Sequence, residues 1–265
     1  MTWLRERLLG RRRDYPTNPD MVAVLAASRA RTRMTLPGTV AWLGQDPTDR
    51  DDDEWYVAGY KRIYRAFIRS SFVIETLPDP ASLAPYRIPV LALAAGGHAV
   101  LAFTDHAALH RCFPSGKHGG HETIASRLLC GLAVEKGDGV IINLGSEYSR
   151  VFDVWETAWA AVGMMPALSR PNETPELKEL IGLLRTFLVN REIDSAYLTW
   201  AIDANDVQGF AIVLSPVGRW PVADRRALGD AFQKSVVNMV PGVGLAIVPV
   251  VAGQSPDHGA MINLL

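Results

Sequence analysis

The amino-acid sequence predicts an α+β protein with two α/β-sandwich-like domains, each a small mixed or antiparallel sheet packed with helices. Three features support this class: short aliphatic runs bounded by Gly or Pro, longer stretches with apolar residues at helical spacing, and a proline-bearing break near the middle. We therefore expect one α+β domain over residues 18–163 and a second over residues 176–265. A basic tail over residues 1–17 precedes them, and a linker over residues 164–175 joins them.

Composition and charge exclude several classes of protein. A chain of 265 residues with 48% hydrophobic content can build cores of this size and is not a disordered protein. The formal net charge of −1 gives no overall field that would attract nucleic acid or an acidic membrane. No apolar run reaches the roughly 18 residues of a membrane-spanning helix, and the first residues lack the pattern of a secretory signal. Cys112 and Cys130 indicate buried reduced thiols and therefore a cytoplasmic location.

The N-terminal region is expected to be mainly helical. Residues 1–13 form a short basic amphipathic segment, which is either a tail docked on the protein or a weak contact with a membrane or a partner. Residues 18–20 read Asn-Pro-Asp, a typical helix start, and Met21 follows at a core position. The aspartates of residues 46–54 lack the glycine and glutamate of a calcium-binding loop. We expect them to cap a helix whose apolar face includes Tyr64.

The central part of the first domain is expected to contain a hairpin followed by a helix. Residues 88–94 and 98–103 are aliphatic runs separated by two glycines, which favours a tight turn between two strands. Thr104 and Asp105 follow directly. Either side chain can accept hydrogen bonds from the free N–H groups of a helix that carries Leu109, so this segment is a strand-to-helix unit.

A second helix is expected to open at Thr123, with Ile124, Leu128 and Leu132 on one face. Glycines after this helix lead into residues 140–142, a β-branched run that is typical of a buried strand. Small polar residues follow this strand at its carboxyl end, where sheets often hold ligands.

The rest of the chain shows the same two patterns. The remaining expected elements, in chain order, are a strand over residues 72–74, a helix over 151–162, a helix over 177–188, strands over 193–202 and 207–214, a helix over 228–236, and strands over 244–248 and 261–262. Their order in the second half suggests a small antiparallel sheet with a helix on one face.

Two stretches of the first domain carry a resemblance to a known family. Residues 100–105 read Val-Leu-Ala-Phe-Thr-Asp, and residues 139–146 read Gly-Val-Ile-Ile-Asn-Leu-Gly-Ser. Their order resembles the N-terminal domain of the SseB (enhanced serine sensitivity) family, whose members usually have a proline where Leu144 stands. Residues 194–265, with Ala-Tyr-Leu near their start, resemble the C-terminal domain of the same family. The resemblance implies an architecture and offers no catalytic residues.

A ligand site is predicted at the turn that follows the buried strand. Asn143, Gly145, Ser146, Glu147 and Tyr148 would gather there, beside free backbone N–H groups. Such a cluster can bind a small polar ligand, for example an amino acid. The alternative is that these residues only cap the helix that follows.

A metal site is the competing prediction. His106 and His110 stand at positions i and i+4 of a predicted helix, and His118 and His121 follow closely. Imidazoles at this spacing can chelate zinc or a similar metal. Ala107 stands where a zinc protease carries its catalytic glutamate, so no general base accompanies the histidines. The alternative is that all four are exposed or helix-capping residues beside a glycine-rich loop.

These observations favour binding over catalysis. The sequence lacks a phosphate-binding loop, a dinucleotide fingerprint and a serine-nucleophile elbow. We expect a cytoplasmic, non-catalytic binding or interaction module that takes a protein partner or a small polar ligand, uses no cofactor and does not bind nucleic acid. Two alternatives stay open: a metal-dependent hydrolase built on the four histidines, and a toxin-immunity protein. The chain is also a candidate homodimer.

Overall fold

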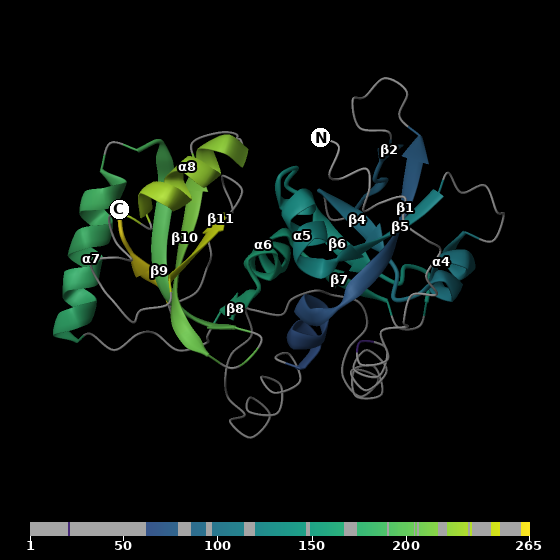
Figure 1. Cartoon of the computed structure of the whole chain (residues 1–265), viewed down its shortest axis with the longest axis horizontal. Coiled ribbons are helices and arrows are strands. Elements are labelled where there is room, and N and C mark those ends of the chain that lie inside the picture. The colour runs from purple at the N-terminus through teal and green to yellow at the C-terminus, as the bar shows by residue number, and fades with distance from the viewer. Residues whose placement is uncertain are drawn as a thin grey trace.

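The computed structural model has helices and mixed sheets, which confirms the predicted α+β class (Figure 1). It describes residues 21, 62–78, 86–93, 97–113, 120–146, 149–166, 174–189, 191–203, 205, 207–216, 222–232, 234, 245–249 and 261–265. Met21 is helical and fully buried, as expected. The predicted tail over residues 1–17 and the acidic stretch over residues 46–54 lie outside the described residues.

Helices and strands are interspersed along the described chain, often with two or more strands in succession. Up to α6 they are, in chain order, a helix over residues 62–69, β1 (Ser71–Pro78), β2 (Tyr86–Arg87), β3 (Val90–Ala92), β4 (His98–Ala102), α4 (His106–Cys112), β5 (Gly120–Ala125), α5 (Ser126–Val134), β6 (Gly139–Ile142), β7 (Arg150–Phe152) and α6 (Val154–Val162). After α6 they are β8 (Met164–Pro166), α7 (Pro175–Leu188), β9 (Ile193–Asp203), β10 (Gln208–Pro216), α8 (Val222–Phe232), β11 (Leu245–Pro249) and β12 (Ile262–Asn263).

A mixed sheet with the strand order β3-β4-β6-β7 forms the centre of the first half. β3 and β4 pair antiparallel, which confirms the predicted hairpin, and Gly97 in its turn has a φ of +80°, a conformation that glycine adopts without strain. β4 and β6 are parallel, so their carboxyl ends meet at one edge of the sheet. A second sheet, β2-β1-β5, joins the first through a bridge between Val73 and Phe103.

The two faces of the β3-β4-β6-β7 sheet bury different side chains, because alternate residues of a strand point to opposite faces. Leu101 and Ile141 pack in one cluster with Leu109 of α4. Val140 and Phe152 belong to another cluster, together with residues of α5, α6 and the helix over residues 62–69. Every residue of β6 is buried, as its β-branched sequence predicts.

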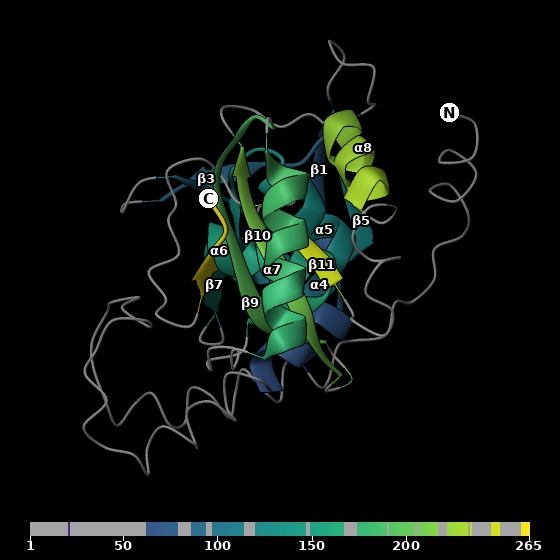
Figure 2. The ribbon, with the colours of Figure 1, turned by 90° about the vertical axis from the view of Figure 1, so that its left-hand side faces the viewer.

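The second half contains another mixed sheet, with the strand order β11-β10-β9-β12, and β8 also pairs with β9. β10 and β11 are parallel, so this sheet is mixed and not fully antiparallel. Leu198 and Ile212 point to the face that α7 and α8 cover, where Leu184 and Phe232 pack against them. Figure 2 shows α7 lying in front of β9 and β10. The amphipathic pattern predicted for α7 is therefore confirmed.

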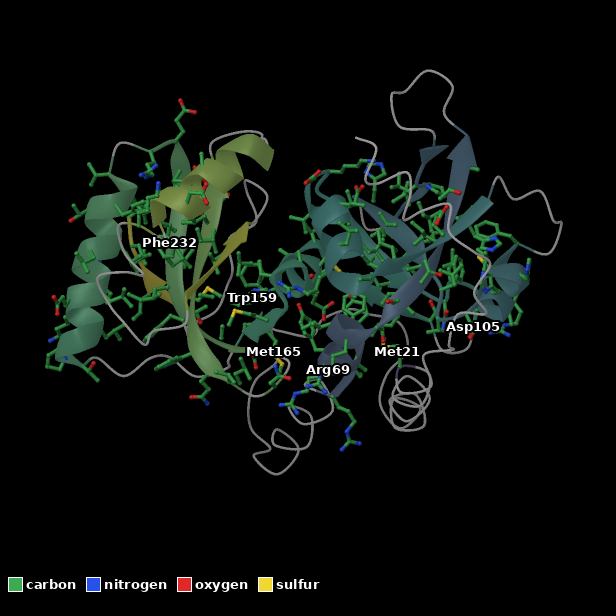
Figure 3. All side chains as sticks on the ribbon, viewed as in Figure 1. Met21, Arg69, Asp105, Trp159, Met165 and Phe232 are labelled. Atoms are coloured by element: carbon green, nitrogen blue, oxygen red, sulfur yellow. The ribbon has the colours of Figure 1, made fainter. Side chains whose placement is uncertain are left out.

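The opposite face of the second sheet shares a core with the first half. Trp159 of α6 is fully buried, and its cluster includes Met165 of β8. The same cluster contains Ala201 of β9 and Val213 of β10. α6 lies between the two sheets, and Trp159 and Met165 lie at the middle of the molecule (Figures 1 and 3). The division into two domains stays a prediction.

The predicted linker over residues 164–175 begins with a strand. β8 pairs antiparallel with the end of β9, and Met165 is buried. Residues 164–166 form a strand and not a linker because Met164 and Met165 are apolar and pack in the core beside α6. The far end of the same segment is also ordered: Thr174 caps α7 by accepting a hydrogen bond from the N–H of Leu177 over 3.2 Å. Residues 167–173 lie outside the described residues.

The sequence predicted a helix that begins at Thr123, and both its start and its buried face were predicted wrongly. Residues 120–125 form β5, and Thr123 lies directly opposite Val73 of β1. α5 begins only at Ser126 and buries Leu129 instead, whereas Leu128 is 59% exposed and Leu132 is also exposed. Apolar residues surround this helix almost completely, so their spacing alone does not select the face that packs.

Candidate functional site

The turn after β6 is organised by the side chain of Asn143. This residue is 3% exposed and has a φ of +53°, a left-handed conformation that asparagine tolerates better than most residues. Its Oδ1 accepts a hydrogen bond from the N–H of Thr104 over 2.9 Å, and its Nδ2 donates to Thr104 Oγ1 over 3.1 Å. The side chain thus ties the ends of the parallel strands β4 and β6 together.

The predicted ligand-binding residues of this turn have different environments. The amide of Asn143 hydrogen-bonds to Thr104 through both its Oδ1 and its Nδ2. Gly145 is exposed, with a φ of +77°, and Ser146 is partly buried and donates its N–H to the carbonyl of Asn143 over 3.0 Å. Glu147 and Tyr148 lie outside the described residues. Ligand binding at this turn stays a prediction.

The alternative role expected for this turn, capping the next helix, belongs to another residue. Asp153 accepts a hydrogen bond from the N–H of Glu156 over 2.7 Å, and the Glu156 side chain accepts one from the N–H of Asp153 over 3.2 Å. This reciprocal pair is a capping box at the start of α6. Asn143 instead acts one strand earlier, between β4 and β6.

A cluster of ionisable side chains lies where α4 packs against β1 and β5. Asp105 caps α4 by accepting a hydrogen bond from the N–H of Ala108 over 2.7 Å, as predicted, and it lies at the start of α4 in Figure 3. The ring of His106 in the first turn contacts the ring of His121, with centroids 4.4 Å apart. Glu75, buried on β1, stands directly opposite His121. The structure therefore brings two of the four predicted histidines together.

The other two predicted histidines are His110 and His118. His110 is exposed on the second turn of α4, and His118 lies outside the described residues. Across the part of the chain that the structure describes, no three His, Cys, Asp or Glu side chains are arranged to hold a metal ion. The metal site stays a prediction, and Glu75 is a neighbour that sequence reasoning missed. A lone carboxylate in the otherwise apolar and hydroxyl-bearing run of residues 71–77 was the available signal.

The two cysteines are free thiols. Burial raises the pKa of Cys130 to about 12, although a hydrogen bond with Ser126 partly opposes the change. Burial also raises the pKa of Cys112, and the negative charge of Glu75 adds to this effect. Both groups are therefore protonated at neutral pH and lack the lowered pKa of a cysteine nucleophile.

The buried carboxyl group of Glu156 in α6 has a structural role. Glu156 pairs with Arg150 of β7 at 3.0 Å, and the guanidinium of Arg150 lies over the ring of Phe152. The hydroxyl of Tyr64 donates a hydrogen bond to the carbonyl of Glu156, which links the helix over residues 62–69 to α6. Burial raises the pKa of Glu156, and the nearby Arg150 opposes that shift.

Large apolar side chains are exposed on β3, at the end of the β3-β4-β6-β7 sheet opposite β7. All three residues of β3 are exposed, and Val90 and Leu91 keep 45% and 38% of their surface accessible. The sequence predicted this strand but not its exposure, because a short aliphatic run is typical of a buried strand.

A comparison of the chain with protein-family models, curated proteins and solved structures finds no match. Within the described residues, no helix combines the length and the apolar character that crossing a membrane requires. The site and its surroundings are therefore the basis for a functional assignment.

Proposed function

We propose that the chain is an SseB-like cytoplasmic protein that works as a non-catalytic binding module, and that its main ligand is a protein partner. The SseB-like stretches form β4, the cap of α4, β6 and the turn after it. Asn143 and Thr104 hold these pieces together, so the resembling residues act mainly as a scaffold. A scaffold of this kind can hold other surface residues in position to bind a partner.

The exposed strand β3 is the observation that carries this proposal. Val90 and Leu91 are apolar, adjacent and exposed on opposite faces of a strand at the edge of a sheet. Strand edges of this kind accept a further strand from another chain, because main-chain hydrogen bonds and flanking apolar contacts form together. The small-ligand alternative has less support, because the amide of Asn143 is already used inside the protein.

The test compares capture of cellular proteins by the wild type and by the double variant Val90→Ser/Leu91→Ser. We expect one or more proteins to be cross-linked to the wild type and lost from the variant. The control is Val189→Ser, which changes an even more exposed apolar residue at the end of α7. Equal capture by all three proteins would contradict the proposal. A thermal-shift screen with amino acids tests the small-ligand alternative, which predicts a rise in Tm that the double variant Asn143→Ala/Ser146→Ala abolishes.

The second candidate function is a metal-dependent hydrolase, and the contact between His106 and His121 beside Glu75 favours it. Native mass spectrometry of protein purified without added metal or tag histidines separates the two functions. One zinc per chain, lost in His106→Ala/His121→Ala but kept in the exposed-site control His98→Ala, would support the hydrolase. A mass without metal, also after zinc is added, would exclude it.

A further inference from the structure

We propose that β3 is a self-association edge, at which a second copy of this chain extends the β3-β4-β6-β7 sheet by antiparallel β3–β3 pairing. This inference rests on the proposed role of the chain as a protein-binding module, and it names one partner for the exposed strand. β3 lies at the end of its sheet, and among the described strands it pairs only with β4.

The direction of the backbone groups of β3 follows from bonds inside the sheet. The carbonyl of Ala102 accepts a hydrogen bond from the N–H of Asn143, so the even-numbered residues of β4 point their backbone groups toward β6. The odd-numbered residues, including Ala99, point theirs toward β3. Leu91 stands opposite Ala99, so its N–H and C=O are used by β4.

Val90 and Ala92 consequently direct their N–H and C=O groups away from β4, toward the outer edge. These outward groups are self-complementary. With a two-fold axis at Leu91, Val90 of one copy stands opposite Ala92 of the other, and each such pair exchanges two hydrogen bonds. On one face the larger Val90 meets the smaller Ala92, and on the other face the two Leu91 side chains meet.

Charge favours the same partner. β3 carries no ionisable side chain, whereas β7 at the other end of the sheet carries Arg150 and β5 carries His121 and Glu122. Charged residues at sheet edges are a common protection against strand pairing, and β3 lacks this protection. The net charge of −1 means that two copies approach each other with little repulsion.

The length of β3 limits the strength of this contact. Three residues bury much less surface than a standard protein interface, which takes about 800 Å² from each partner. We therefore expect a weak dimer that dissociates on dilution. Sedimentation velocity of the full chain over a concentration series should show a reversible monomer–dimer equilibrium.

Cysteine substitutions test the register of the pairing in a Cys112→Ser background. The two Leu91 residues would form a non-hydrogen-bonded pair with Cα atoms about 4.5 Å apart, which lies within the range of a disulfide. Leu91→Cys should therefore give a disulfide-linked dimer under mild oxidation. Val90→Cys is the matched control: its cysteine faces Ala92 of the second copy, so cross-linking should be at least tenfold slower. Equal cross-linking of both variants, or of neither, would overturn the proposal.

A backbone substitution gives an independent readout. Ala92→Pro removes an N–H that points outward, so it should abolish the dimer and leave the Tm of the monomer nearly unchanged. Val189→Lys, at an exposed position of the other half, should leave the dimer intact. A dimer that persists in Ala92→Pro contradicts the pairing. A wild type that is monomeric at every concentration refutes self-association alone, because loss of captured proteins from Val90→Ser/Leu91→Ser would still support a different partner at β3.

Discussion

The two ends of the β3-β4-β6-β7 sheet differ in how far the protein's own packing covers them. At β7, Arg150 pairs with Glu156 of α6 and its guanidinium lies over the ring of Phe152. At β3, Val90 and Leu91 are exposed and no ionisable side chain belongs to the strand. Among the described residues, side-chain contacts therefore cover the β7 end of the sheet, whereas β3 pairs only with β4. Substitutions of buried residues in α6 should therefore lower the free energy of unfolding. Substitutions in β3 should weaken association with a partner and leave the free energy of unfolding nearly unchanged.

The largest difference in stability is expected between a substitution at buried Trp159 of α6, the helix that packs beside β7, and one at exposed Val90 of β3. Trp159→Ala removes a fully buried indole and should lower the free energy of unfolding by about 3–5 kcal/mol. Val90→Ala should change it by less than about 0.5 kcal/mol, because the side chain is already exposed. Urea unfolding of both variants measures this difference. Similar losses of unfolding free energy in Trp159→Ala and Val90→Ala would contradict the expected contrast between α6 and β3.

A conservative variant shows which property of Trp159 matters. Its indole N–H is buried and has no hydrogen-bond partner among the described residues. Trp159→Phe removes that group and keeps most of the apolar volume, so it should recover most of the stability lost in Trp159→Ala.

The next largest effect is expected at Asn143, which joins the two strands in the middle of the sheet. Asn143→Ala leaves the buried N–H of Thr104 without its acceptor, at a cost of about 1–3 kcal/mol. Asn143→Gly relieves the left-handed backbone but still lacks the amide, so it separates the two contributions. Both variants are compared with the wild type by thermal unfolding. An unchanged Tm in Asn143→Ala would show that the hydrogen bonds between Asn143 and Thr104 are not needed for stability.

A similar cost is expected at the end of α6, where Gly163 has a φ of +77°. A Cβ at this position would stand 2.9 Å from Nε of Arg127, so Gly163→Ala should lose about 1–3 kcal/mol. Gly182→Ala is the matched control, because Gly182 lies within α7 with open space around its Cβ position. It should gain about 0.4–1 kcal/mol. Equal effects at both glycines would contradict the structural account.

The smallest expected effect is a change in pH dependence at Glu156. Burial raises the pKa of its carboxyl group in the folded state, so the folded protein binds that proton more tightly than the unfolded chain. Stability from this group is therefore complete at acidic pH, and it is lost as pH rises from about 4.5 through the folded pKa. Glu156→Gln cannot titrate. The stability advantage of the wild type over this variant should shrink between acidic and neutral pH, and an advantage that grows would show the opposite sign.

The sequence predicted those parts of the fold whose signals are local. The two glycines between residues 88–94 and 98–103 marked the β3–β4 hairpin, and the uninterrupted run at residues 140–142 marked β6. The apolar stripe of α7 and the hairpin of β9 and β10 were also visible as spacing. In each case neighbouring residues carry the information.

The parts that sequence reasoning missed depend on distant partners. β5 is largely polar, and it becomes a strand because β1 pairs with it along its whole length. Without β5, the contact between His106 and His121 could not be foreseen, nor could the position of Glu75 beside it. At the turn after β6, Asn143 was correctly placed at a strand end, but its bond to Thr104 depends on the parallel pairing of β4 and β6.

The burial of Trp159 between two sheets also concerns how the chain loses its structure. Residues of both sheets belong to the core cluster that contains Trp159, so exposing the inner face of one sheet would also expose part of the other. Heating should therefore give one calorimetric transition whose measured enthalpy equals the van't Hoff value, as for a two-state protein. Replacing either half with another sequence would have to preserve the residues that pack in the cluster around Trp159.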